Sequence, residues 1–296
     1  MSHFSVMVIG PNPEDQLAPY HEFECTGVDD EYVQDVDTTE DVLSRLTIVG
    51  VDGKTETLQE ALEWHGLENR VVGDLSEVET EGDHKYGWVL VQSGQLVKAV
   101  RRTNPNAKWD WYQVGGRWTG FLKLKPGAKG SVGEPGLMTQ PASVGRADAA
   151  LFGDIDIEGM RHDAGEEASE RWIRARKVAP DLWESWESVR NRFDSLVDAR
   201  EFYNGQDAIK ALHKGDIWFD TDQFLTDHGT YVEDARNAAL TTFTVIYQGT
   251  WYERGKMGWF GCVSEEKEKD VWLETFEEIL GKLTPTDLVT IVDCHI

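Results

Sequence analysis

The chain has 296 residues and a formal net charge of -25, with 54 aspartates and glutamates against 29 lysines and arginines. Such a charge repels phosphate surfaces, so it argues against direct nucleic-acid binding and against attraction to anionic lipid. No run of about 18 apolar residues exists, which excludes a membrane-spanning helix. Residues 1–10 lack the basic segment of a secretory signal, and three cysteines suit a reducing compartment, so we expect a soluble cytoplasmic protein.

Charge is unevenly distributed along the chain. Residues 1–44 contain eleven acidic residues and no lysine or arginine, and we call this segment the acidic arm. Residues 98–129 contain eight basic residues against one acid, Asp110. One molecule therefore combines an acidic arm with a basic segment rich in aromatic residues.

The first half of the chain predicts strands and a short helix. Residues 4–9 alternate loosely and end at a Gly-Pro-Asn-Pro turn, which is typical of a strand. Residues 57–65 have a cap residue and helical apolar spacing, so we expect a helix there that ends near Gly66. Residues 86–91 and 118–124 predict two further strands.

The second half predicts a helical section followed by a strand, a helix and a strand. Helical spacing covers residues 163–200, with a new helix beginning at Pro180. Strands are expected at 240–247 and 288–292. Between them, we expect a helix that is capped by Ser264 and buries Trp272 and Phe276.

These elements indicate an α+β fold in which a mixed or antiparallel sheet carries flanking helices and an inserted helical section. We expect a discontinuous core domain of residues 1–127 and 205–296. Residues 128–160 are rich in glycine and proline and predict a linker or mobile loop. Residues 161–204 form the predicted helical insert.

The most distinctive motif is Trp-Asp-Trp-Tyr-Gln-Val-Gly-Gly-Arg-Trp at residues 109–118. Paired glycines permit close backbone approaches, an arginine offers a planar fork for carboxylate or phosphate, and aromatic rings stack on bases. The motif therefore indicates either a pocket for an anion, nucleotide or partner carboxylate, or a tight turn between core strands whose arginine stacks on a tryptophan. The candidate binding residues are Trp109, Trp111, Tyr112, Gly115, Gly116, Arg117 and Trp118.

Two pairs of residues near the ends have donor types that bind zinc: His21 with Cys25, and Cys294 with His295. Adjacent residues of a strand point to opposite faces, so Cys294 and His295 are poorly arranged to bind one ion. Cys294 also suggests a nucleophile, but a nearby negative charge raises the pKa of a thiol. We expect buried or packed residues at these positions, and neither a metal nor a cofactor.

The acidic arm has two interpretations. A spaced row of carboxylates imitates nucleic-acid phosphates and occupies a basic cleft of a partner. The alternative is a solvated loop that keeps the protein soluble. The candidate residues are Asp29, Asp30, Glu31, Asp35 and Asp37.

Four strings spread over the whole chain carry a resemblance. They are Met-Ser-His-Phe-Ser-Val-Met-Val-Ile-Gly at 1–10, Leu-Ala-Pro-Tyr-His-Glu-Phe-Glu-Cys-Thr-Gly at 17–27, Trp-Tyr-x-x-Gly-Gly-Arg-Trp at 111–118, and Gly-Lys-Met-Gly-Trp at 255–259 with the ending Val-Asp-Cys-His-Ile. In these strings the chain resembles a family of bacteriophage and prophage proteins, most of which have no assigned function. Its size and acidity are similar to those of anti-defence proteins directed against the Gabija system.

This resemblance implies an inhibitor that acts in the infected bacterial cytoplasm. Such a protein binds a host antiviral complex, the Gabija nuclease–helicase complex, and blocks its access to DNA without catalysis. We expect a homo-oligomer on this interpretation. The alternative is a nucleotide- or small-anion-binding protein or enzyme that uses Arg117 as a phosphate clamp and Trp109 or Trp111 for stacking.

Overall fold

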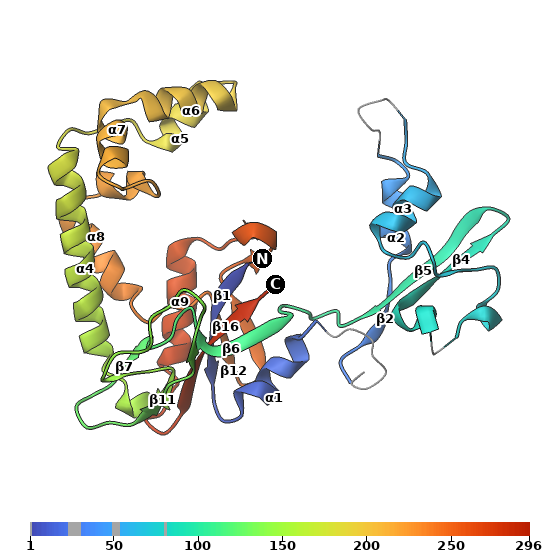
Figure 1. Ribbon diagram of the computed structural model, residues 1–296, viewed down its shortest axis with the longest axis horizontal. Coiled ribbons are helices and arrows are strands. Elements are labelled where there is room, and N and C mark those ends of the chain that lie inside the picture. Colours follow the sequence, from blue (N-terminus) through green and yellow to red (C-terminus); the bar gives the residue numbers. More distant parts are fainter. Residues whose placement is uncertain (1, 23–30, 49–53, 80–81) are drawn as a thin grey trace.

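The structure is a computed structural model that describes residues 2–22, 31–48, 54–79 and 82–296. Figure 1 shows a central sheet, a small lobe on one side that contains α2 and α3, and a helical unit on the other that contains α4 to α8. Helices and mixed sheets together confirm the predicted α+β class.

The central sheet joins the two ends of the chain. β1 (His3–Ile9) pairs antiparallel with β16 (Leu288–His295) and parallel with β12 (Thr244–Tyr247). The described part of this sheet has the order β13-β12-β1-β16-β11-β8, and β6 (Trp111–Gly116) also pairs with β16. β13 spans Thr250–Glu253, and β11 spans Ala149–Leu151. The first and last strands of the chain are therefore neighbours in one sheet.

Both faces of the sheet are covered, which explains why β1 is apolar almost throughout. Met7 and Ile9 pack on one face, in a core with α9 (Lys269–Leu280). Val6 and Val8 pack on the other, in a core that contains Trp109 and Leu17 of α1 (Pro13–Leu17).

α9 matches its predicted buried face but not its predicted start. Trp272 and Phe276 are buried, and the indole Nε1 of Trp272 donates to Thr242 O at 3.0 Å. The predicted cap Ser264 instead belongs to β15 (Val263–Ser264), which pairs with β14 (Lys256–Met257). The chain needs residues 265–268 to leave this hairpin, so the helix begins at Lys269.

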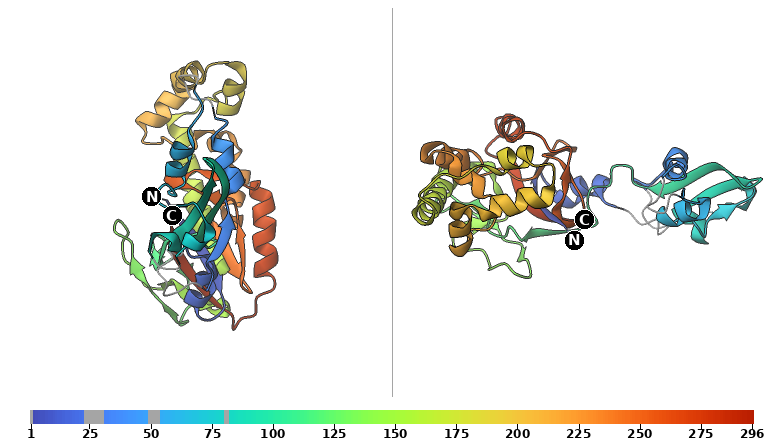
Figure 2. Two further views of the ribbon diagram at one scale, coloured as in Figure 1. Left: turned by 90° about the vertical axis from the view of Figure 1, so that its right-hand side faces the viewer. Right: turned by 90° about the horizontal axis from the view of Figure 1, so that it is seen from above.

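The described residues between positions 34 and 103 form a lobe with a sheet of its own. β2 (Gln34–Asp37), β5 (Gln95–Thr103), β4 (Gly87–Gln92) and β3 (Val71–Val72) lie in that order among the described residues. α2 (Thr39–Arg45) and α3 (Leu58–Trp64) bury Val42 and Leu62 against this sheet. The views in Figures 1 and 2 agree that the lobe stands apart from the central sheet. The predicted core segment 1–127 is therefore divided in two.

The helical unit is larger than the predicted insert 161–204. α4 (Ile157–Val178) leaves the edge of the sheet near β7 (Leu122–Lys123), and α8 (His228–Asn237) packs along it. Between them lie α5 (Trp186–Arg192), α6 (Leu196–Gly205) and α7 (Asp207–Lys214). Ser185 and Ser195 cap α5 and α6, so the helix predicted from Pro180 is two short helices.

Residues 128–160 contain short strands rather than only a linker. β8 (Gly130–Ser131) pairs with β11, and β9 (Glu134–Pro135) pairs with β6. β10 (Arg146–Ala147) pairs with β7. A side chain at Gly130 would place its Cβ 2.5 Å from Ala147 Cβ, so at this position the glycine allows close strand packing. None of the helices described here is long and apolar enough to cross a membrane.

Candidate functional site

The Gly-Gly-Arg-Trp motif forms a turn around two buried carboxylates. Gly115 and Gly116 have φ angles of +79° and +53°, a conformation that favours glycine. Asp293 Oδ2 accepts a hydrogen bond from Arg117 N at 2.9 Å, and Asp148 Oδ1 accepts one from Gly120 N at 2.5 Å. Both aspartates are almost completely buried, so the turn supplies the hydrogen bonds that a buried carboxylate requires.

The predicted clamp, Arg117, takes part in this turn only through its backbone. Its side chain is exposed, and no acidic side chain within the described residues pairs with it. Trp118 is partly buried against the core and reaches a different pocket, described below. The geometry of the motif is that of a turn between core strands, and it does not place Arg117 beside Trp109 or Trp111.

Two histidine–aspartate pairs meet where β1, β6 and β16 lie side by side. His3 Nδ1 lies 2.8 Å from Asp293 Oδ1, and His295 Nδ1 lies 2.6 Å from Asp110 Oδ1. The two imidazole rings contact each other edge to face with centroids 4.9 Å apart, and Trp111 packs edge-on against both. Each carboxylate fixes the orientation of its histidine.

The three suggested metal ligands that the structure describes, His21, Cys294 and His295, do not form a metal cluster. His21 stacks on Trp109 with ring centroids 4.4 Å apart, and His295 pairs with Asp110. Cys294 is fully buried, and this burial raises the pKa of its thiol well above the usual range, which keeps it protonated and unreactive. Cys25 lies outside the described residues. No group of three potential ligands is found in the ranges that the structure describes.

An acidic and aromatic cleft lies where α1, β6 and the start of the lobe converge. It has a volume of about 660 Å³, and we call it the acidic cleft. Its lining includes four carboxylates, two tryptophans and two tyrosines, and it contains no lysine or arginine among the described residues. The lining residues that carry the argument are Glu14, Asp15, Glu31, Trp109, Asp110, Trp111 and Tyr112.

The electrostatics of this cleft favour a cation. Glu14, Asp15 and Glu31 are exposed, and none of them forms an ion pair with a described lysine or arginine. Burial raises the pKa of Tyr112, and the negative charge of Glu14 raises it further. Trp111 is 49% exposed, so one large aromatic surface is open to a ligand beside these charges.

Only part of the acidic arm reaches the cleft. Asp35 and Asp37 lie on β2, which pairs with the basic strand β5. Asp35 Oδ1 lies 3.7 Å from Arg102 Nε, and Asp37 Oδ2 lies 4.0 Å from Lys98 Nζ. Hydrogen bonds from Thr39, with a smaller contribution from Lys98, lower the pKa of Asp37. These two acids therefore face basic residues of the same chain.

The remaining candidates of the arm are divided. Glu31 lines the acidic cleft, whereas Asp29 and Asp30 lie outside the described residues. The sequence interpretation placed neither Glu14 nor Asp15 in a site. Their position in the sequence could have indicated a site. Glu14 and Asp15 follow the turn that ends β1 and lie in the short helix α1, which leads the chain back toward the motif strand β6.

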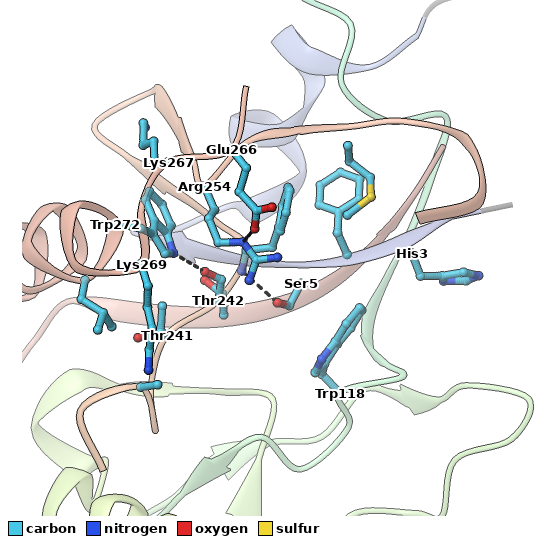
Figure 3. Close-up of a pocket in the computed structure, with 15 residues that line it drawn as sticks. His3, Ser5, Trp118, Thr241, Thr242, Arg254, Glu266, Lys267, Lys269 and Trp272 are labelled. Atoms are coloured by element: carbon cyan, nitrogen blue, oxygen red, sulfur yellow. Dashed lines mark hydrogen bonds and ion pairs between the residues drawn. The ribbon is translucent and has the colours of Figure 1, made fainter. Parts of the chain in front are cut away.

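A second pocket, which we call the basic pocket, lies beside the start of β1 and is shown in Figure 3. Its volume is about 570 Å³. Three basic side chains line it against one acid, Glu266. The basic residues are Arg254, Lys267 and Lys269, and the aromatic residues are Phe4, Trp118, Phe243 and Trp272.

No protein-family model, curated protein or solved structure matches the chain.

Proposed function

We propose that the protein is a phage-encoded anti-defence inhibitor that binds a host antiviral complex, the Gabija nuclease complex, and blocks its access to DNA. The observation that carries this proposal is the acidic cleft, whose described lining has four carboxylates, an exposed tryptophan and one histidine, His21, but no lysine or arginine. The four sequence strings that resemble phage proteins, and the net charge of -25, support the same function.

The chemistry of the acidic cleft suits an arginine or lysine of the target. The exposed face of Trp111 provides a cation–π surface, and Glu14, Asp15 and Glu31 provide acceptors for a guanidinium or ammonium group. Basic residues of this kind line the DNA-binding surface of a nuclease. A protein that occupies them competes with DNA for the same contacts.

The net charge adds a long-range contribution. Opposite charges steer two proteins toward each other and raise the association rate at low salt. A homo-oligomer would present several acidic clefts to one target, and linked contacts of this kind raise the overall affinity. The proposal requires binding alone and no catalytic step.

The cleft is tested by neutralising three carboxylates without changing their shape. In the variant Glu14→Gln, Asp15→Asn, Glu31→Gln, we expect slower association with the purified Gabija complex and weaker inhibition of its nuclease. The matched control is Glu187→Gln, Asp198→Asn, Glu201→Gln, which removes the same charges from exposed positions of the helical unit.

Association rates are measured by surface plasmon resonance at low and at moderate salt. The cleft variant should lose more than about tenfold in association rate at low salt, and the control should change little. Equal losses in both variants would show that only net charge matters and would reject the acidic cleft as the interface. Absence of any complex with the unmodified protein would reject this target.

A further inference from the structure

We propose that the basic pocket is a binding site for a mononucleotide, with Arg254 holding the phosphate and Trp118 contacting the base. This inference does not depend on the proposed inhibitor function, because it concerns another pocket and other residues. It also places the anion site at Arg254 rather than at Arg117, the clamp that the sequence motif suggested.

The composition of the pocket matches a ligand with a negative and an aromatic part. Its volume of about 570 Å³ lies in the range of small-molecule sites. Three basic residues surround it in a protein that is otherwise strongly acidic. A local concentration of positive charge on such a molecule attracts a small anion to this position.

Arg254 is the basic residue whose two terminal nitrogens remain available to a ligand, although its Nε is paired with Glu266. Its guanidinium lies over the ring of Phe243, with its Cζ 5.0 Å from the ring centroid. Its Nε is buried and lies 2.9 Å from Glu266 Oε1 without the alignment of a hydrogen bond. The two terminal nitrogens have no acceptor among the described residues, so a planar fork faces the pocket, as phosphate recognition requires.

The two lysines already have protein partners, so neither ammonium group is the main phosphate contact. Lys269 Nζ lies 2.9 Å from Asp234 Oδ2. Lys267 Nζ donates to the backbone oxygen of Glu253 at 2.7 Å and lies above Trp272. These contacts hold both ammonium groups at the edge of the pocket, and Lys267, whose partner is an uncharged carbonyl, adds positive charge there.

Trp118 provides the surface for the base. Trp272 is buried and bonded to Thr242 O, so its indole belongs to the core. Trp118 is only partly buried, and Figure 3 shows it on the opposite side of the pocket from Lys267 and Trp272. A base stacks on any open aromatic face, which makes such a contact tolerant of base identity.

The test measures binding of AMP, GMP, CMP and UMP to the full chain by isothermal titration calorimetry. We expect micromolar to millimolar dissociation constants for at least one nucleotide. Arg254→Ala should weaken binding by about tenfold or more, since a charge-assisted fork is lost. Arg117→Ala is the matched control, because it removes an exposed guanidinium next to Trp118 and should leave the affinity unchanged.

A second variant and two further probes keep the result unambiguous. If Arg254→Ala does not fold, Arg254→Lys keeps the charge without the fork and should still weaken binding several-fold. Inorganic phosphate and adenosine should each bind more weakly than AMP. The proposal is overturned if no nucleotide binds at millimolar concentration, if phosphate binds as tightly as AMP, or if Arg117→Ala has the effect expected of Arg254→Ala.

Discussion

Gly116 shows how a single residue without a side chain positions the centre of the sheet. A Cβ at this position would lie 2.4 Å from Asp293 Cβ, and the φ of +53° disfavours other residues. We expect Gly116→Ala to lower the free energy of unfolding by more than about 2 kcal/mol, since the backbone penalty adds to the displacement of a buried, hydrogen-bonded carboxylate. Urea denaturation measures this loss.

The control for this substitution is Gly127→Ala. Gly127 also has a positive φ, of +80°, but no described atom lies within 4 Å of the point that a Cβ would occupy there. Gly127→Ala should lower the free energy of unfolding only by the backbone penalty of about 1 kcal/mol. Equal losses at the two glycines would show that contact with Asp293 contributes nothing.

The paired glycines and the turn at this motif follow from the sequence, but the partners of the turn do not. Asp293 accepts a hydrogen bond from a residue 176 positions away, and Asp148 is bonded by residues 28 and 29 positions away. A buried aspartate has the same appearance in a sequence as a solvated one, because only its tertiary partners distinguish the two. For the same reason, the sequence could not show that Arg117 contacts a carboxylate through its backbone N–H and not through its guanidinium.

Among the elements, the helical unit depends on one acidic side chain. Asp222 accepts hydrogen bonds from Trp183 Nε1 at 2.8 Å, from Trp186 N at 2.5 Å and from Tyr203 OH at 2.5 Å. Burial and this carboxylate raise the pKa of Tyr203, which keeps its hydroxyl a donor. Asp222 therefore joins α5, α6 and the turn at Thr221–Leu225.

The substitution Asp222→Asn replaces one carboxylate oxygen with an NH2 group. This group is itself a donor and cannot accept the hydrogen bonds that Trp183, Trp186 and Tyr203 donate to Asp222. We expect a loss of about 3 kcal/mol in the stability of the helical unit, measured by tryptophan fluorescence during urea denaturation. Asp194→Asn, at an exposed position between α5 and α6, serves as the control and should be neutral. A cooperative transition at an unchanged urea concentration would contradict this role of Asp222.

Elements with a long repeating pattern could be predicted, and short paired strands could not. The helical spacing of Trp272 and Phe276 identified the buried face of α9, and the apolar run of β1 identified a buried strand. β8 to β11 are two or three residues long, which is too short for any period to be visible. The glycine-rich composition of the surrounding segment, residues 128–160, is the same as that of a linker, because close strand packing and chain freedom both favour glycine.

At the scale of the whole molecule, the net charge of -25 should limit stability at low ionic strength. Raising the salt concentration from about 0.01 M to about 0.1 M shortens the Debye length from about 30 Å to about 10 Å. Repulsion among the acidic side chains then weakens more than the scattered surface ion pairs do, because exposed pairs contribute little. We expect the Tm to rise by a few degrees in differential scanning calorimetry. A Tm that falls with salt would show that the ion pairs dominate.

The adjacency of the two ends has a consequence for the topology of the chain. Ser2 N donates to Ile296 O at 3.0 Å, and Ile296 N donates to Ser2 O at 3.1 Å. A short linker would join these residues into a closed ring without disturbing β1 or β16, and the ring could then be opened at Gly127, where the described surroundings are empty. The order of elements along the chain would change, while the pairing of every strand would be retained.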